Sequence, residues 1–212
     1  MPRRAILLFA AACVALAAIV AVSVALMLNS HGASNSAAGG AARQGASTGL
    51  PSVGGPFQLV DQEGRAVDQT LLEGRWSLVF FGFTYCPDFC PTTLAALEAT
   101  KAQLGAQGEA LQVVFISVDP ERDTPAALKA YLASDGFPES VVGLTGTPQQ
   151  VAEAARVYRA FYEKVGEGEG YTMNHSLTVY LMGPDGRFRT AVAHDLDPEQ
   201  AARVIAAAIR RG

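Results

Sequence analysis

Cysteine is scarce in this chain. Only Cys13, Cys86 and Cys90 occur among its 212 residues. Cys13 lies in an apolar N-terminal run, where we expect it to act as a small apolar residue. The part of the chain with globular composition has roughly 160 residues, enough to bury a hydrophobic core without metals or disulfides. A disulfide between the two close cysteines is therefore not needed to stabilise the fold, and the pair is expected to have a chemical role.

The chain also has no internal repeat and no excess of basic residues. Beyond residue 52, 20 acidic residues outnumber 13 basic ones and leave a net charge of −7. This charge argues against nucleic acid or anionic lipid as a partner and is compatible with a metal ion or a cationic patch. Basic residues are absent between Trp76 and Thr100. Their absence argues against a peroxidase of the peroxiredoxin kind, which wants an arginine beside its reactive cysteine.

The N-terminal run is nearly free of polar residues. After Arg3 and Arg4, the 24 residues from Ala5 to Leu28 contain a single serine and no charge. As a helix with about 1.5 Å rise per residue, the run would span roughly 36 Å and cross a hydrocarbon core of roughly 30 Å. It is longer than the apolar stretch of a signal peptide, so we expect an uncleaved transmembrane helix in residues 1–29, although Ser36 to Ala38 offers a cleavage site.

The flanking charges and the following segment predict where the rest of the chain lies. Arg3 and Arg4 favour a cytoplasmic N-terminus. We therefore expect a single-pass protein of the bacterial inner membrane with its soluble domain in the periplasm, with the mitochondrial inner membrane as the alternative. Disulfides are permitted in either location. Residues 30–52 are rich in Gly, Ala and Ser and predict a flexible tether, which leaves residues 53–212 as one folded domain.

Strand and helix patterns alternate in the folded part. Near-continuous β-branched and aromatic runs at 76–82 and 111–118 predict strands buried on both faces, and the helical pattern at 92–104 makes them a parallel crossover unit. Two antiparallel hairpins are predicted at 57–67 and 177–193, and further helices are predicted to begin near Pro125, Pro148 and Pro198. This order predicts an α/β fold, a thioredoxin-like sandwich with a central mixed β-sheet flanked by helices.

The cysteine pair directly follows the first buried strand, at the sheet edge where open α/β folds place their sites. Pro87 and Pro91 predict a tight turn in which Cys90 caps the next helix and Pro91 is its first residue. Both sulfurs then lie at a helix N-terminus, which favours the thiolate form that attacks disulfides and binds metals. Three residues separate Cys86 from Cys90, one more than in thioredoxin-type reductases, which still permits a disulfide and leaves room for an ion.

A specific metal site needs a further ligand, and the chain has only three histidines. His31 lies in the predicted tether, and His194 is predicted to be a surface residue. His175 lies just before the strand that starts at Leu177, a segment expected beside the thiol turn. From placement alone, His175 is either a ligand or an ordinary polar loop residue. With Cys86 and Cys90 it would form a set of two thiolates and one imidazole, which suits copper held for handover better than four-coordinate structural zinc.

Three acidic residues lie near these positions in the sequence. Asp88 either influences the thiolates and partner docking or is a solvated turn residue. Asp119 ends the second buried strand near the site. Asp123 is expected to cap the next helix.

Three blocks of residues carry a resemblance to a known family. They are Gly82-Phe-Thr-Tyr-Cys-Pro-Asp-Phe-Cys-Pro91, Phe115-Ile-Ser-Val-Asp-Pro-Glu-Arg-Asp-Thr124, and Asn174-His-Ser176 followed by Tyr180-Leu-Met-Gly-Pro-Asp-Gly186. Over about residues 53–211 the chain resembles the Sco/SenC family of membrane-anchored copper-binding proteins that serve cytochrome c oxidase assembly. Asn174 stands where this family often has Asp, which argues against a carboxylate partner for His175 at that position.

The resemblance implies a thioredoxin-like fold and copper bound by Cys86, Cys90 and His175. It also implies delivery of copper to the binuclear CuA site in cytochrome c oxidase subunit II, or reduction of the thiols of that site, with a periplasmic copper donor as a further partner. The leading hypothesis is therefore a copper metallochaperone. The alternative is a thiol-disulfide oxidoreductase that acts on partner cysteines and needs only Cys86 and Cys90 as a redox-active pair; the two roles can coexist, because a disulfide blocks copper and reduction restores the ligands.

Overall fold

The computed structural model describes residues 53–195 and 197–212. The expected membrane anchor at 1–29 and the tether at 30–52 lie outside the described residues, as do Cys13 and His31. Within the described part of the chain, no helix has both the length and the apolar character needed to span a bilayer.

A seven-stranded mixed sheet forms the centre of the domain, in the order β2-β1-β5-β4-β3-β8-β9, and β6 and β7 form a separate two-stranded sheet. The strands are β1 (Gln58–Asp61), β2 (Ala66–Asp68), β3 (Ser77–Gly82), β4 (Gln112–Ser117), β5 (Val141–Thr145), β6 (Tyr162–Val165), β7 (Thr172–His175), β8 (Thr178–Met182) and β9 (Phe188–Ala193). The helices are α2 (Phe89–Leu104), α3 (Ala106–Glu109), α4 (Pro125–Leu132), α5 (Pro148–Tyr158) and α6 (Pro198–Ile209), with short 3-10 turns η1 (Gln69–Leu72) and η2 (Gly168–Gly170).

The two predicted buried strands are the middle of the sheet. Every residue of β3 and β4 is buried, and the strands pair in parallel with Phe80 opposite Phe115. Strand β8 pairs antiparallel to the other edge of β3, which makes the sheet mixed. Since α2 connects β3 to β4, the predicted crossover unit is confirmed.

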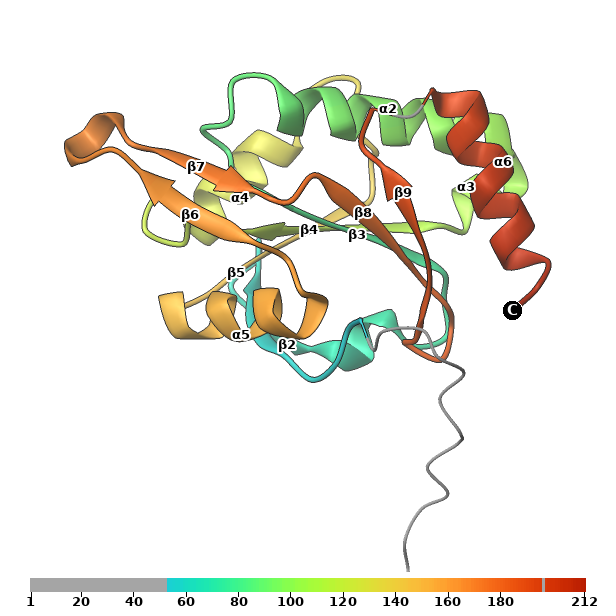
Figure 1. Ribbon diagram of the computed structural model, residues 1–212, viewed down its shortest axis with the longest axis horizontal. Coiled ribbons are helices and arrows are strands. Elements are labelled where there is room, and N and C mark those ends of the chain that lie inside the picture. Colours follow the sequence, from blue (N-terminus) through green and yellow to red (C-terminus); the bar gives the residue numbers. More distant parts are fainter. Residues whose placement is uncertain (1–52, 196) are drawn as a thin grey trace, which may run out of the picture. The chain divides into compact units, whose positions relative to one another are not determined.

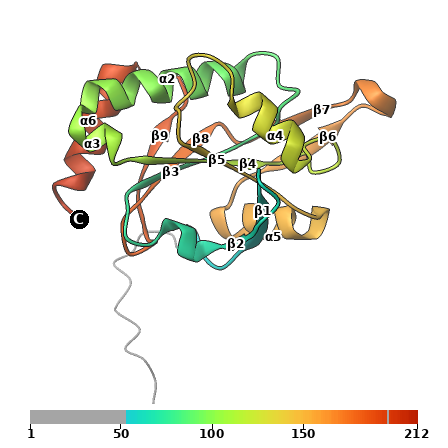
Figure 2. The same cartoon turned by 180° about the vertical axis from the view of Figure 1, so that it is seen from behind.

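Helices cover both faces of this sheet (Figures 1 and 2). Helices α2, α4 and α6 lie on one face, while α5 and η1 lie on the other. This arrangement confirms the predicted thioredoxin-like α/β sandwich. It leaves the end of β3, the start of α2 and the β6–β7 hairpin on the same side of the domain, far from the C-terminus.

Side chains cap helices α5 and α6, which begin at the predicted prolines Pro148 and Pro198, whereas the predicted cap of α4 is wrong. Thr147 forms a capping box with Gln150 at the start of α5, and the Asp197 side chain caps α6. Asp123 does not cap α4, because the hydroxyl of Thr124 accepts the Ala127 N–H instead. The Asp123 prediction was wrong because two adjacent residues both suit a cap, and tertiary contacts bury the first of them completely.

Helix α2 begins two residues earlier than predicted. Asp88 occupies the N-cap position without a side-chain capping bond, so Cys90 and Pro91 lie in the first turn of the helix. A proline is tolerated there because the first turn has no intrahelical acceptor for its missing N–H. The expectation that both sulfurs lie at this helix N-terminus still holds.

Several short elements were not predicted. Strand β5 is a five-residue run interrupted by Gly143, and α3 is a single turn. The β6–β7 hairpin, which projects from the end of the domain (Figure 1), is short and mostly exposed, with Glu163 and Lys164 in its first strand. A strand without a buried apolar run gives little sequence signal.

Candidate metal centre

The structure brings together the three residues that the sequence singled out. Each of Cys86, Cys90 and His175 offers one ligand atom, and these atoms all lie within 4.8 Å of one another. The Cys90 Sγ atom is 3.6 Å from His175 Nε2, although 85 residues separate them in the chain. Both cysteines are free thiols in this structure.

The turn from Cys86 to Cys90, called the thiol turn, is held by hydrogen bonds from backbone N–H groups and by close packing on β3. The N–H of Cys86 donates to the carbonyl of Phe83, and the N–H of Cys90 donates to Cys86 Sγ at 3.4 Å. Gly82, the last residue of β3, leaves room for the second sulfur: a Cβ atom there would lie 2.8 Å from Cys90 Sγ and 2.7 Å from the Phe115 ring. The motif therefore needs glycine at position 82 for space.

His175 ends strand β7, and its ring is oriented by three contacts. Its edge-on neighbours are Phe80 and Phe83, with ring centroids 6.2 Å and 5.7 Å away. Its Nδ1 atom lies 3.0 Å from the carbonyl oxygen of Ser176. Because a carbonyl can only accept, this bond places the proton on Nδ1 and leaves the Nε2 lone pair directed towards the thiols.

The two thiols have opposite acidities. A hydrogen bond from the Cys90 thiol lowers the pKa of Cys86 to about 3; burial opposes this shift, and hydrogen bonds from the backbone of Cys90 and Asp88 support it. Donating that bond, together with burial, raises the pKa of Cys90. In the metal-free protein, Cys86 is therefore the thiolate of the pair and Cys90 keeps the proton.

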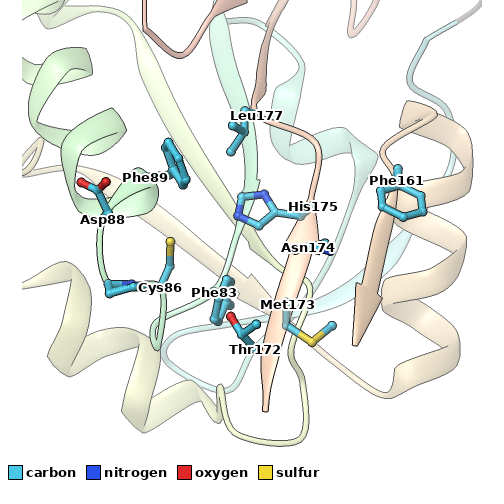
Figure 3. A pocket seen from close by; sticks show the side chains of 11 residues that line it. Phe83, Cys86, Asp88, Phe89, Phe161, Thr172, Met173, Asn174, His175 and Leu177 are labelled. Carbon is cyan, nitrogen blue, oxygen red and sulfur yellow. The ribbon is translucent and has the colours of Figure 1, made fainter. Parts of the chain in front are cut away.

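A pocket of about 400 Å³ opens next to these ligands. Figure 3 shows the Cys86 sulfur and the His175 ring facing this space from opposite sides, with Asp88 and Phe89 on the α2 side and Phe161 across the opening. Cys86 and His175 both belong to its lining, so the pocket gives access to two of the three ligands.

Two exposed aromatic side chains, Phe89 and Phe161, line this pocket. The large hydrophobic residues that are exposed in the described part of the chain are Tyr85 (62%), Phe89 (50%), Phe161 (58%) and Val165 (41%). Tyr85 directly precedes Cys86, Phe89 and Phe161 line the pocket, and Val165 ends β6. Sequence reasoning did not identify them, because exposure of an aromatic residue depends on the tertiary structure.

The three acidic residues have distinct roles. The Asp88 side chain lines the pocket, and its backbone N–H helps to stabilise the Cys86 thiolate. Asp123 accepts hydrogen bonds from the backbone and hydroxyl of Thr84 and from the hydroxyl of Ser117. It thereby ties the segment that leads into the thiol turn to the end of β4. Asp119, at the end of β4, accepts hydrogen bonds from the Tyr171 hydroxyl and from Arg122.

His194 and Arg122 both lie near the thiol pair in the folded chain, but neither is a ligand. His194 is half-buried, packs its ring on Phe89 at 5.7 Å and is not part of the ligand group. The sequence around the cysteines has no basic residue, but folding brings Arg122 next to this segment. The Arg122 guanidinium lies 4.5 Å from the ring centroid of Tyr85, the residue before Cys86. Two of its nitrogens are engaged by Asp119 and by the carbonyl of Tyr171.

The donor set suits a soft metal ion. Thiolate ligands select Cu(I), zinc or iron–sulfur centres, and imidazole suits copper and zinc. A closed structural zinc site has four protein ligands, whereas here three meet beside an open pocket. The residues present therefore fit copper held with one side accessible.

Comparison with known proteins identifies the family. The SCO1/SenC family model matches residues 45–210. The chain belongs to the SCO1/SenC family. Protein SenC of Rhodobacter capsulatus is 36% identical over 193 residues, which cover 91% of this chain and 85% of that protein. The chain spans about half the length of the mitochondrial SCO1 proteins that it matches, 48% in Arabidopsis thaliana and 51% in Saccharomyces cerevisiae.

Solved structures of this family share the fold. Copper-bound ScoI of Bradyrhizobium japonicum is 43% identical, with a TM-score of 0.66 over 73% of this chain and 98% of that chain. BsSco, a member of the Sco family of cytochrome c oxidase assembly proteins in which a disulfide switch is identified, is 27% identical, with a TM-score of 0.61 over 76% of this chain and 93% of that chain. The resemblance found in the sequence is thus confirmed at the level of family and fold.

Proposed function

We propose that this chain is a membrane-anchored copper metallochaperone that binds copper through Cys86, Cys90 and His175. It delivers the ion to the CuA site of cytochrome c oxidase subunit II or prepares the thiols of that site. The observation that carries the proposal is the convergence of two sulfurs and one imidazole nitrogen within 4.8 Å of one another. Copper bound to a Sco relative and the role of the Sco family in oxidase assembly support it.

The geometry explains how copper is both held and released. Two thiolates and a neutral imidazole satisfy the preference of Cu(I) for soft ligands, and the pocket leaves one side of the ion accessible. An incoming thiolate of the acceptor can bind on that side before a ligand of this chain leaves. Cys86 faces the pocket while Cys90 is fully buried, so we expect Cys86 to be the first sulfur that the acceptor replaces.

The surroundings of the pocket support a protein as the acceptor. Phe89 and Phe161 present exposed aromatic surface at the pocket, and exposed Tyr85 directly precedes Cys86. Aromatic residues are enriched where proteins meet. A partner that rests on these side chains would bring its own cysteines to the ligands and exclude water during transfer. The net charge of −7 beyond residue 52 favours a partner with a basic rim.

The cellular setting is part of the proposal. Residues 1–29 would anchor the chain in the bacterial inner membrane, and residues 30–52 would tether the domain in the periplasm, where it receives copper from a periplasmic donor. A single-pass anchor keeps the domain near a membrane-embedded oxidase. Accessibility of single engineered cysteines to a membrane-impermeant thiol reagent, in a Cys13→Ser, Cys86→Ser, Cys90→Ser background, would map which side of the membrane each segment occupies.

Copper titration of the reduced full chain tests the ligand set. His175→Ala should weaken copper binding by at least about tenfold, because it removes one of three ligands. His194→Ala is the matched control, since it removes a half-buried imidazole outside the ligand group, and it should leave affinity unchanged. Unchanged affinity in His175→Ala would remove His175 from the site.

A second function is favoured by the acidity of the thiol pair. The lowered pKa of Cys86 and its position on the pocket suit it to attack a disulfide, after which Cys90 would resolve the mixed disulfide. Such a thiol-disulfide oxidoreductase needs no imidazole ligand. His175→Ala should therefore retain reductase activity, and loss of either cysteine should abolish it.

A further inference from the structure

Arg122 contacts three segments that surround the metal centre. Its guanidinium carbon lies 4.5 Å from the ring centroid of Tyr85 and 3.6 Å from that of Tyr171. Its Nε donates to an Asp119 carboxylate oxygen at 2.5 Å, and its Nη1 donates to the carbonyl of Tyr171 at 3.0 Å. The side chain is only 16% exposed, so these contacts hold it in one place.

The two tyrosines belong to the segments that carry the ligands. Tyr85 directly precedes Cys86, and Tyr171 directly precedes strand β7, which ends at His175. Arg122 itself belongs to the loop that follows β4. One side chain thus connects the thiol turn, the central sheet and the histidine strand.

The histidine strand needs such a connection. Among the strands of the described residues, β6 and β7 pair only with each other and lie outside the seven-stranded sheet. An isolated two-stranded hairpin is marginally stable. Further contacts of this hairpin reach the same loop: the Tyr171 hydroxyl donates to Asp119 at 2.6 Å, and Lys164 pairs with Glu121 at 2.8 Å. Lys164 also lies 3.9 Å from the Tyr171 ring centroid. The loop after β4 therefore supports the hairpin in addition to the core packing of Tyr171 and Met173, and Arg122 contacts both the carbonyl and the ring of Tyr171.

We propose that Arg122 is a positioning residue for the metal centre, which holds the strand of His175 against the thiol turn through its contacts with Tyr171 and Tyr85. The inference rests on the proposed role of His175 as a copper ligand. Arg122 donates its hydrogen bonds to Asp119 and Tyr171 and to none of the three ligands, so its effect on copper passes through the placement of β7. Both its charge and its planar shape are used, because it stacks on rings and donates to a carboxylate and a carbonyl in fixed directions.

Copper titration of the reduced full chain provides the first test. Arg122→Met keeps the apolar stem and loses the guanidinium, and Arg122→Lys keeps the charge without the planar group. Both should lower copper affinity by about tenfold or more, as expected for a residue that orients a ligand. Arg189→Met is the matched control. Arg189, on β9, pairs with Asp185 at 2.9 Å and lies over the ring of Trp76. Its loss should change copper affinity by less than about twofold, because distant sites act independently.

Combining these variants with His175→Ala separates positioning from general stabilisation. If Arg122 acts by placing His175, Arg122→Met should cause no further loss of affinity once the imidazole is gone. A full additional loss in the double variant would overturn the positioning role while leaving His175 as a ligand. No effect of His175→Ala alone would instead overturn the ligand set. Should Arg122→Met fail to fold, Arg122→Lys supports the same cycle.

Hydrogen exchange gives a readout that is independent of copper. In the metal-free chain, the backbone amides of β7 should exchange faster in Arg122→Lys than in the unmodified chain, whereas those of β3 should not change. Tyr85→Leu, at a largely exposed position, should produce a smaller change in the same direction. Unaltered exchange in β7 would show that Arg122 does not hold the histidine strand.

Discussion

His175 Nδ1 lies 3.0 Å from the carbonyl oxygen of Ser176, the next residue in the chain. This short local contact supplies the hydrogen-bond acceptor that metal-binding imidazoles need on their second nitrogen. Asn174, beside His175, carries no carboxylate, and in this structure the backbone carbonyl of Ser176 is the acceptor.

Asn174→Asp should therefore have little effect on the ligand. The acceptor of His175 is already present, and the side chain of residue 174 is exposed at the pocket. We expect copper affinity to change by less than about threefold, well below the tenfold or greater cost of losing a true partner of a metal-bound histidine. Titration of the reduced chain measures this, and a gain of tenfold would indicate that a carboxylate at 174 replaces the backbone acceptor.

Gly82→Ala should disturb the thiol pair. Its new Cβ would overlap Cys90 Sγ and the Phe115 ring, and overpacking of this kind costs about 1–3 kcal/mol of unfolding free energy. Copper affinity should fall together with stability, because the buried sulfur must move. Gly170→Ala is the control, since a Cβ there meets nothing within 4 Å. Equal behaviour of the two variants in urea unfolding and copper titration would contradict the packing argument.

Phe89→Ser and Phe161→Ser test the acceptor surface. Neither residue is a ligand, so copper affinity should be nearly unchanged, while the rate of copper transfer to a soluble CuA domain of subunit II should drop about tenfold in the double variant, as for loss of an interface hot spot. Leu71→Ser is the control. It alters a partly buried residue of η1, which lies on the sheet face opposite α2, and it should not change the transfer rate. A rate that stays constant in all these variants would mean that the acceptor does not rest on this surface.

Two buried carboxylates should give opposite pH dependences of stability. Burial raises the pKa of Asp123 above its ordinary 3.8, although hydrogen bonds from Ser117 and Thr84 oppose the shift. A raised folded pKa means that its contribution is present below pH 3.8 and is lost as pH rises through the folded value. For Asp61, burial acts to raise the pKa, but hydrogen bonds from Arg65 and Glu63 outweigh it and the pKa is lowered. Its contribution is present above pH 3.8 and is lost as pH falls through the folded value.

Urea unfolding of Asp123→Asn and Asp61→Asn across this range measures both effects. The stability difference between the unmodified chain and Asp123→Asn should shrink, or reverse, as pH rises above 3.8. The difference for Asp61→Asn should shrink as pH falls below 3.8. If both differences change in the same direction, the ionisation state assigned to one of these carboxylates is wrong.

The sequence predicted the parts of the site that depend on local signals. Strand β3 is recognisable in the sequence as a continuous run of apolar residues. The two prolines that follow it, Pro87 and Pro91, indicate the turn that contains Cys86 and Cys90. The helix start was misplaced by two residues, because a proline in the first turn and one at the first position look alike in sequence. His175 was recognisable as a candidate by its position before β8.

The remaining features depend on contacts between distant segments. The hairpin that carries His175 is short, and its first strand, β6, contains charged residues. The sequence there shows no alternation of apolar and polar residues that would indicate a strand. Arg122 lies near Tyr85 and Tyr171 only after the loop beyond β4 folds back towards both. Asp123 looks like a helix cap in sequence, yet it binds Thr84 and Ser117. Tertiary packing decided each of these outcomes.

X-ray absorption spectroscopy of the copper-loaded full chain tests the ligand set most directly. The proposed site predicts two sulfur neighbours and one imidazole nitrogen around copper, with the nitrogen lost in His175→Ala and retained in His194→Ala. Chemical oxidation of Cys86 and Cys90 to a disulfide before loading should prevent copper binding. A spectrum without a nitrogen neighbour, or one that His175→Ala leaves unchanged, would contradict the proposed metal centre.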